Sequence, residues 1–403
     1  MKSGNCDSTP PTFAPGILLA FSVACLTGIF FVNFLSRIIL SPLMPWIQKD
    51  LGISHAQAGS VFLSLSAGYF IALVGSGYLS CRIGHKKTIS LSAISIGLSL
   101  FFLSMAPGLW QLQLGMCILG ITAGVYLPSA IATLTQIVPK GQWGRVISVH
   151  ELAPNAAFIC APALADLLVH QLTWHGVLFV LGIAAVFLGL AHLLFIQAGS
   201  FKGSALDFAY LDKIARLPAF WIMVFLFAMG ITSTLGIYNM LPIFMVSERN
   251  FTPESANKIL ALSRIPTLAT ALLGGVAADR LGPRITMGVV LFITGLVTIC
   301  LGLATGPLVA ILVFLQPVLA VCFFPAGFAV LSTLAPAKAR NLTVSLTIPV
   351  AFVIGAGMVP AFIGLVGDYG HLDLGICAAG AMIFLGAFAS PFARVSNQKQ
   401  HSG

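Results

Sequence analysis

Long apolar stretches separated by short polar segments run through the whole 403-residue chain. A helix needs roughly 20 apolar residues to cross the hydrocarbon core of a bilayer. Twelve stretches meet that need, at 17–45, 56–80, 88–106, 109–137, 146–169, 176–198, 218–246, 256–278, 286–304, 307–335, 342–366 and 373–393. Each is continuously apolar, whereas the strands of a transmembrane barrel alternate. The sequence therefore predicts an all-α integral membrane protein with twelve transmembrane helices.

The composition excludes several classes of function. Only 8% of the residues are charged and 58% are hydrophobic, whereas a soluble domain has about 25% charged residues. A soluble enzyme, a nucleic-acid-binding protein and a disordered chain are thereby excluded. The eight cysteines form no C-x-x-C pair, so we expect neither a zinc site nor a disulfide framework. The predicted spans hold no His/Asp cluster and no Ser/His pair, and we expect no enzymatic activity, cofactor or metal.

The basic residues are distributed unequally between the two ends of the predicted spans. Of the 20 lysines and arginines, Lys49, Arg249 and Lys258 lie at one end, Arg37 and Arg264 lie inside spans, and the other fifteen lie at the end that holds both termini. Cytoplasmic loops carry the excess of Lys and Arg, so both termini are predicted to be cytoplasmic. The net charge of +9 then reflects topology. The compact loops favour a prokaryotic inner membrane.

The two halves of the sequence repeat one another. The pattern G-x-x-x-C-R-x-G at 77–84 returns as G-x-x-x-D-R-x-G at 275–282, which is 198 residues later. Pro45, Pro128 and Pro139 each have a proline counterpart 197 residues further on. Repeats of six spans related by an axis along the membrane normal organise two-bundle transporters, whose binding site lies near the midplane.

The longest polar segment, 199–216, separates these halves. We therefore predict an N-terminal six-helix bundle over 1–198, a cytoplasmic central loop over 199–216 and a C-terminal six-helix bundle over 217–403.

Two loop motifs resemble those of a known family. The segments GYLSCRIGHKK (77–87) and GVAADRLGPR (275–284) are similar to the loop motif G-x-L-A-D-R-x-G-R-K of the major facilitator superfamily. The resemblance covers nearly the whole chain and implies that superfamily's fold, two pseudo-symmetric six-helix bundles. It also implies a cytoplasmic gate between the bundles, formed by Gly77, Arg82, Gly84, Lys86, Asp279, Arg280 and Arg284.

The chain departs from the family pattern in three places. Cys81 replaces the acidic residue of the first motif, and Met116 replaces the arginine of the fourth span. The segment ELAPNAAFICAP (151–162) replaces the Gly-x-x-x-Gly-Pro pattern of many drug antiporters. The last two departures weaken an assignment to proton-driven drug efflux.

Arg37 and Arg264 are the strongest candidates for substrate binding, because a charge inside a span is costly and marks a functional site by default. Both lie about eight residues inside the outer end of their spans, which is about 12 Å at 1.5 Å per residue. Their repeat counterparts, Thr234 and Ser66, are uncharged. Because arginine binds carboxylate or phosphate through two hydrogen bonds, the pair could clamp one anion. Alternatively, each could extend to the surface or pair with an acid such as Asp166.

The resemblance supports the first alternative, since similar arginines occur in organic-anion branches of the superfamily. Other polar residues of the spans could complete the substrate site, although each could instead make a hydrogen bond between helices. These residues are Asn33, Tyr69, Tyr126, Tyr238, Asn239 and Gln316.

Glu151 is the candidate proton carrier, with His150 beside it and Asn155 one turn further along the fifth span. A carboxylate in a low dielectric can take up a proton, and histidine titrates near neutral pH. The alternative is that Glu151 pairs with Arg82 or Arg145 at the cytoplasmic rim.

The sequence thus predicts a secondary active transporter that moves a small organic anion by alternating access in symport with protons. Its expected partners are the anionic substrate, H+ and membrane lipid, with no nucleic acid, and we expect a monomer. Two alternatives stay open, a proton-driven exporter of drugs or metabolites and a sensor of the same fold that transports nothing. The identity of the anion, the direction of transport and the coupling ion stay open as well.

Overall fold

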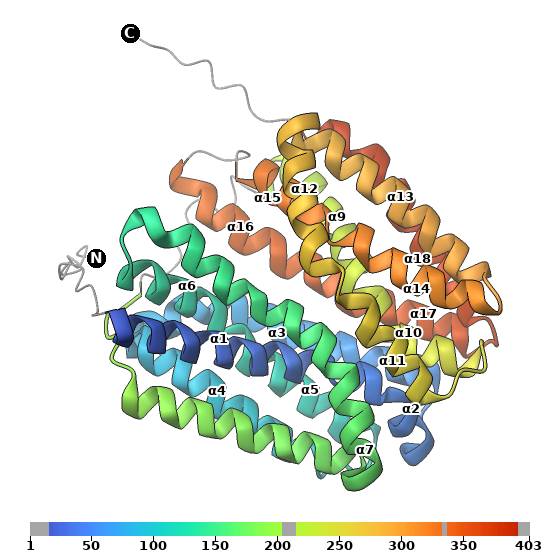
Figure 1. Cartoon of the computed structure of the whole chain (residues 1–403), viewed down its shortest axis with the longest axis horizontal. Helices are drawn as coiled ribbons and strands as arrows, with labels where there is room; N and C mark the ends of the chain where they lie inside the picture. The colour runs from blue at the N-terminus through green and yellow to red at the C-terminus, as the bar shows by residue number, and fades with distance from the viewer. Residues whose placement is uncertain (1–15, 204–214, 333–336, 394–403) are drawn as a thin grey trace.

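Helices form every regular element of the computed structural model within the residues that it describes, which are 16–203, 215–332 and 337–393 (Figure 1). In the first half these helices are α1 (Gly16–Ile38), α2 (Leu40–Leu51), α3 (His55–Ile83), α4 (His85–Leu103), α5 (Leu109–Gly124), α6 (Tyr126–Ile137), the short η1 (Lys140–Gln142) and α7 (Trp143–Phe195).

The second half is built in the same way, with short breaks between consecutive helices. Its elements are α9 (Pro218–Ile231), η3 (Thr232–Gly236), α10 (Ile237–Ser247), α11 (Pro253–Arg264), α12 (Thr267–Leu281), α13 (Pro283–Leu303), α14 (Pro307–Ala320), α15 (Phe323–Leu331), α16 (Ala337–Phe352), η4 (Val353–Met358), α17 (Val359–Gly367), α18 (Leu372–Gly386) and η5 (Ala387–Phe392). Two of them, η3 and η4, are π-helical.

The described helices account for twelve membrane crossings. Ten are long and apolar enough to cross a bilayer, and the pair α11 and α12, bent by 40° at Ile265–Pro266, makes an eleventh. The 53-residue α7 supplies two crossings by itself, because Thr173 leaves the helical conformation at φ 56° and ψ 172° and the helix doubles back there (Figure 1). The twelve predicted transmembrane helices are therefore confirmed.

Helix breaks occur at matching positions in the two halves. The first crossing is interrupted at Ile39 in the first half and at η3, which ends at Gly236, in the second. The fourth crossing is interrupted at Val125 in the first half and at Cys322 in the second. Both pairs are 197 residues apart, the spacing of the repeated prolines, so the internal repeat extends to the local backbone geometry.

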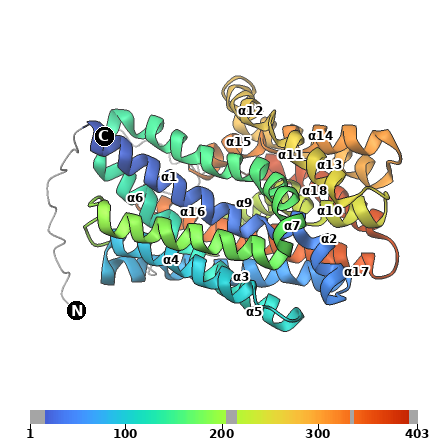
Figure 2. The ribbon, with the colours of Figure 1, turned by 60° about the horizontal axis from the view of Figure 1, so that its bottom comes forward.

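The two halves are joined at one end of the molecule, which we call the closed end. There the Ser41 hydroxyl donates a hydrogen bond to the Tyr238 carbonyl oxygen over 2.7 Å, and the Asn257 amide donates to the Pro42 carbonyl oxygen over 3.4 Å. Figure 2 shows α2, α10 and α17 gathered at this end, away from the start of α1. Further side-chain hydrogen bonds between the halves also lie at the closed end.

Glycines allow α3 and α17 to pack against each other at the closed end. A Cβ atom on Gly59 would overlap the carbonyl oxygen of Pro360, and one on Gly364 would overlap the carbonyl oxygen of His55. The nearest neighbours of each glycine all belong to the opposite half. The closest contacts of these two positions are therefore between the halves, and they limit how closely the halves approach.

A carboxylate of the second half also caps a helix of the first half. Ser54 is the N-cap of α3, and its hydroxyl donates to Oδ2 of Asp368 over 2.7 Å, while the Ala56 N–H donates to Oδ1 over 3.2 Å. A negative charge at a helix N-terminus is stabilised by the exposed N–H groups and the helix dipole. Asp368 therefore favours the closed arrangement of the two halves.

Replacing Asp368 by asparagine should shift this end toward opening. The loss of a surface-exposed, charge-assisted cap costs about 1 kcal/mol, which changes the ratio of open to closed molecules about five-fold. Electron–electron distances between spin labels on Lys49→Cys and Thr305→Cys, on opposite halves of this end, would measure the ratio in a cysteine-free background. An unchanged distance distribution would show that Asp368 does not contribute to closure.

Candidate functional site

Arg37 lies in the last turn of α1 and is enclosed by aromatic side chains. It is 5% exposed, and its guanidinium carbon lies 4.6 Å from the ring centre of Phe34 and 4.7 Å from that of Tyr69. Phe352 of α16 lies further off, at 6.0 Å. Guanidinium groups bind to the faces of aromatic rings through the ring quadrupole, so these rings hold the charge in place without neutralising it.

Arg264, the last residue of α11, has a similar environment in the other half. It is 4% exposed, and its guanidinium carbon lies 4.7 Å from the ring centre of Phe158 and 4.8 Å from that of Tyr238. The Tyr238 hydroxyl is buried without a hydrogen-bond partner among the described residues.

A single aromatic row connects the two arginines. The rings of Phe34 and Phe158 meet edge to face with their centres 5.1 Å apart, and Phe158 packs in the same way against Tyr238 at 5.0 Å. The successive distances of 4.6, 5.1 and 4.7 Å from Arg37 through both phenylalanines to Arg264 place the two guanidinium carbons no more than about 14 Å apart. Two charges from opposite halves therefore lie at the two ends of one aromatic row, with the rings of Phe34 and Phe158 between them.

Neither arginine has an acidic partner in the described parts of the chain, where no carboxylate lies within 4.0 Å of either one. The Nε atom of each is buried without a hydrogen-bond partner. Asp166, the acid considered for such a pairing, lies 3.9 Å from His170 instead, and the low exposure of both arginines also excludes extension to the surface. An unpaired buried charge is unfavourable by several kcal/mol, which an anionic ligand would relieve.

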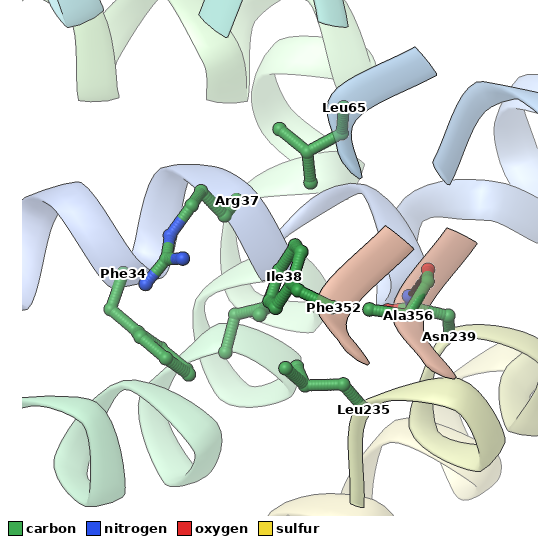
Figure 3. A pocket seen from close by; sticks show the side chains of 8 residues that line it. All are labelled: Phe34, Arg37, Ile38, Leu65, Leu235, Asn239, Phe352 and Ala356. Atoms are coloured by element: carbon green, nitrogen blue, oxygen red, sulfur yellow. Dashed lines mark hydrogen bonds between the residues drawn. The ribbon is translucent and has the colours of Figure 1, made fainter. Parts of the chain in front are cut away.

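A small cavity opens beside Arg37, between the two halves of the chain (Figure 3). In this closed arrangement its free volume is about 10 Å³, which is roughly the room that one water molecule needs. The wall is mostly apolar with few polar groups, which is typical of small-molecule sites. The lining residues are Phe34, Arg37, Ile38, Leu65, Leu235, Asn239, Phe352 and Ala356.

Both π-helical segments contribute to this wall, η3 through Leu235 and η4 through Ala356. The segments also touch, since a Cβ atom on Gly236 would overlap the carbonyl oxygen of Gly355. Single π turns inside α-helices are frequent at functional sites.

The structure brings three of the other predicted substrate residues to the arginines. Tyr69 lies against Arg37 and Tyr238 lies against Arg264. Asn239 lines the cavity, and its amide donates to the Ala356 carbonyl oxygen over 3.3 Å.

The remaining three predicted residues make hydrogen bonds elsewhere. The Asn33 amide donates to the Ala123 carbonyl oxygen over 3.1 Å, beside a second small cavity, and the Gln316 amide donates to the Ser233 carbonyl oxygen over 2.6 Å. Tyr126 bonds His150, as described next.

The predicted proton-coupling residues form a separate cluster on α7. His150 is fully buried, with Nε2 3.0 Å from the Tyr126 hydroxyl. The Glu151 side chain is 49% exposed, and its Oε1 lies 3.7 Å from Nδ1 of His150. The Asn155 amide donates to the Glu151 backbone carbonyl oxygen over 3.0 Å. Neither Arg82 nor Arg145 forms an ion pair with Glu151 in the described structure.

The predicted gate residues lie at the end opposite to the closed end. In the first motif Gly84 adopts φ 84°, and the backbone N–H groups of His85 and Lys86 donate to carbonyl oxygens of Phe201 and Gly199. The Arg82 guanidinium lies over the Tyr78 ring at 4.7 Å.

The second motif has a backbone conformation similar to that of the first. Gly282 adopts φ 89° between α12 and α13, and Gly275 has no neighbour within 4 Å of a Cβ position. Within the described residues no ion pair joins Arg82, Asp279, Arg280 or Arg284 to the opposite half. Gly77 lies in α3, where the Ser80 hydroxyl donates to its carbonyl oxygen.

Sequence reasoning missed the aromatic row and the closed-end contacts. Phe34 could have been found, because residues three apart share a helix face and it precedes Arg37 by three. No pattern in the sequence points to Phe158 or Asp368, whose partners come from distant helices.

Comparisons with known proteins agree with this architecture. The family model described as Major Facilitator Superfamily matches residues 26–262 and 220–403. SauU of Cupriavidus necator, named a probable sulfoacetate transporter, is 24% identical over 93% of both chains. MdtD of Salmonella paratyphi B, named for multidrug resistance, is 25% identical over 38% of this chain and 32% of its own length.

Among solved structures, a bacterial homologue of the human lysosomal transporter Spinster, crystallised in an inward-facing and occupied conformation, has a similar fold. Its TM-score is 0.83 at 15% identity, over 94% of this chain and 97% of that one.

Proposed function

The chain belongs to the Major Facilitator Superfamily, and on that premise we propose that it is a secondary transporter that carries a small organic anion with carboxylate or sulfonate groups. The observation that carries the proposal is the pair of buried arginines, one in each half, that one aromatic row connects and that have no acidic partner among the described residues. A substrate bound between the halves can transmit its binding energy to their relative motion.

The likeness to SauU supports the class of substrate, since sulfoacetate combines a sulfonate and a carboxylate on a two-carbon skeleton. Two guanidinium groups suit such a molecule, because each can bind an oxyanion through two parallel hydrogen bonds. The likeness covers nearly the full length of both chains.

The distribution of basic residues orients the molecule in a bacterial inner membrane. The positive-inside rule places the termini in the cytoplasm, so the closed end faces outward. In this arrangement the contacts of Ser41, Asp368 and Gly364 seal the outer side, and the anion exchanges with the cytoplasm. Transport then requires these contacts to break and form in each cycle, and we propose that protons taken up near Glu151 drive it.

Export of drugs is the second candidate, favoured by the partial match to MdtD. A cationic drug would place a further positive charge beside Arg37 and Arg264, which is electrostatically unfavourable in a low dielectric. The anion proposal is therefore preferred.

Thermal unfolding of the purified protein tests the choice between the two. The compounds to be added are acetate, succinate, sulfoacetate, phosphate and the cationic dye ethidium. Each is added as a salt, and the chloride concentration is kept equal in all samples. A ligand at 100 times its Kd stabilises the folded state by about 2.7 kcal/mol, so we expect a clear rise in Tm with at least one small organic anion. Stabilisation by ethidium alone would contradict the anion proposal and favour export of drugs.

A further inference from the structure

The hydrogen bonds of Tyr126 determine which nitrogen of the neutral, buried His150 ring carries the hydrogen. The Tyr126 hydroxyl lies 2.6 Å from the Leu26 carbonyl oxygen, which can only accept a hydrogen bond. The single hydrogen of the phenol is therefore used in that bond. The same oxygen lies 3.0 Å from Nε2 of His150, so Nε2 must donate. The neutral ring carries its hydrogen on Nε2, which leaves Nδ1 with a free lone pair.

That free nitrogen faces a carboxylate. Nδ1 is buried without a hydrogen-bond partner among the described residues, and Oε1 of Glu151 lies 3.7 Å from it. With a neutral ring, two electron-rich atoms oppose each other there. A proton on Nδ1 would turn this repulsion into an attraction between imidazolium and carboxylate.

The ring cannot readily turn to another partner. Phe30 stacks on it with a centroid distance of 4.4 Å and an interplanar angle of 9°, and Tyr126 lies nearly parallel at 6.0 Å. The titratable groups on described residues that face the ring are Cys25 on α1, Tyr126 on α6 and Glu151 on α7.

The helices α1 and α7 contribute residues both to this cluster and to the anion site. On α1, Phe30 meets Phe34 edge to face at 6.5 Å, and Phe34 in turn lies under Arg37. On α7, His150 precedes Phe158 by eight residues, about 12 Å along the helix. A change at His150 that moves α7 against α1 therefore also moves the aromatic row.

We propose that Nδ1 of His150 is the proton-binding atom that drives the transport cycle, with Glu151 as its entry point and counter-ion. A proton from the solvent first binds the half-exposed carboxylate. Its O–H bond then breaks as an N–H bond forms at Nδ1, which leaves imidazolium beside carboxylate, while the hydroxyl of Tyr126 keeps its hydrogen. This inference rests on the proposed transport function, but its test needs no substrate.

The test measures how pH changes the closed end. Spin labels on Lys49→Cys and Thr305→Cys would report the separation of the halves in nanodiscs at pH 5.5 and 8.5. His55 and His170 also lie at the closed end, His170 within 3.6 Å of Glu254 of the other half, where a change of charge would act directly on the contacts between the halves. Both are therefore replaced by Gln in all samples.

We expect the ratio of open to closed molecules to change at least three-fold between these pH values, and less than 1.5-fold in His150→Gln. Glu151→Gln, at a half-exposed site where folding is not at risk, should also reduce the response. His192→Gln is the matched control, because His192 is an equally buried histidine on the second arm of α7, bonded through Nδ1 to the Ser90 hydroxyl over 2.8 Å. It should keep the full response.

A pH response that persists in His150→Gln, or that is absent before any substitution at His150, would overturn the inference. Equal loss in His192→Gln would do so too, because it would assign the effect to general loss of packing. None of these outcomes bears on anion binding, which the thermal unfolding experiment tests separately.

Discussion

Replacing Arg264 by methionine should abolish anion uptake and, at the same time, raise the thermal stability of the protein without ligand. Truncation of a buried charge that binds an opposite charge costs about 2–5 kcal/mol of binding, which is about a 30- to 4,000-fold loss of affinity. The free protein gains, because Arg264 is 4% exposed with an unpaired Nε, and an apolar side chain of similar length removes that unfavourable burial. Uptake into proteoliposomes and Tm without anion would measure the two effects.

A fall in uptake together with a rise in Tm would indicate a role in binding, whereas a fall in both would indicate a structural role. Arg249→Met is the matched control, because this guanidinium also lies over an aromatic ring, that of Phe244 at 4.8 Å, but has Asp373 within 3.9 Å. Its replacement should lower Tm and leave the affinity for the anion unchanged. Uptake at the normal rate in Arg264→Met would refute the role of Arg264 in the anion site.

Gly364→Val should stop transport by preventing the two halves from coming together at the closed end. Any Cβ at this position overlaps the carbonyl oxygen of His55, and its nearest neighbours all belong to the other half. The overlap therefore acts on the closed arrangement, which loses about 1–3 kcal/mol or more through overpacking. We expect uptake to fall at least ten-fold and the spin labels on Lys49→Cys and Thr305→Cys to move apart.

Gly75→Val provides the control for this substitution. Gly75 lies on α3, the helix that contacts Gly364, but no atom lies within 4 Å of its Cβ position. Uptake and label distances should stay close to those of the unsubstituted protein. If Gly364→Val closes normally, the contact between α3 and α17 does not control the approach of the two halves.

Local signals in the sequence were sufficient for the fold. Apolar length alone indicated twelve crossings, including the two that are fused in α7, because the polar and turn-forming residues near Thr173 interrupt the hydrophobicity. Repeated prolines likewise indicated the internal repeat. The first signal depends only on neighbouring residues and on the thickness of the membrane, and the second only on comparing the sequence with itself.

The candidate site was predictable only where a residue was conspicuous by itself. Arg37 and Arg264 could be singled out because charges in apolar stretches are rare. The link from Tyr126 to His150 was missed, since it depends on how α6 packs against α7, and hydrogen-bond partners from different helices leave no periodic pattern. Asp368 looked like an ordinary loop residue for the same reason, although it caps a helix more than 300 positions away in the sequence.

The unpaired arginines have an electrical consequence for the transport cycle. A membrane potential acts on each elementary charge with about 2.3 kcal/mol per 100 mV when the charge crosses the full field. Empty, the proposed site carries two positive charges with no carboxylate within 4.0 Å in the described chain, whereas a bound dianion would neutralise both. The voltage across the membrane would therefore act mainly on the return of the empty carrier and little on the loaded one.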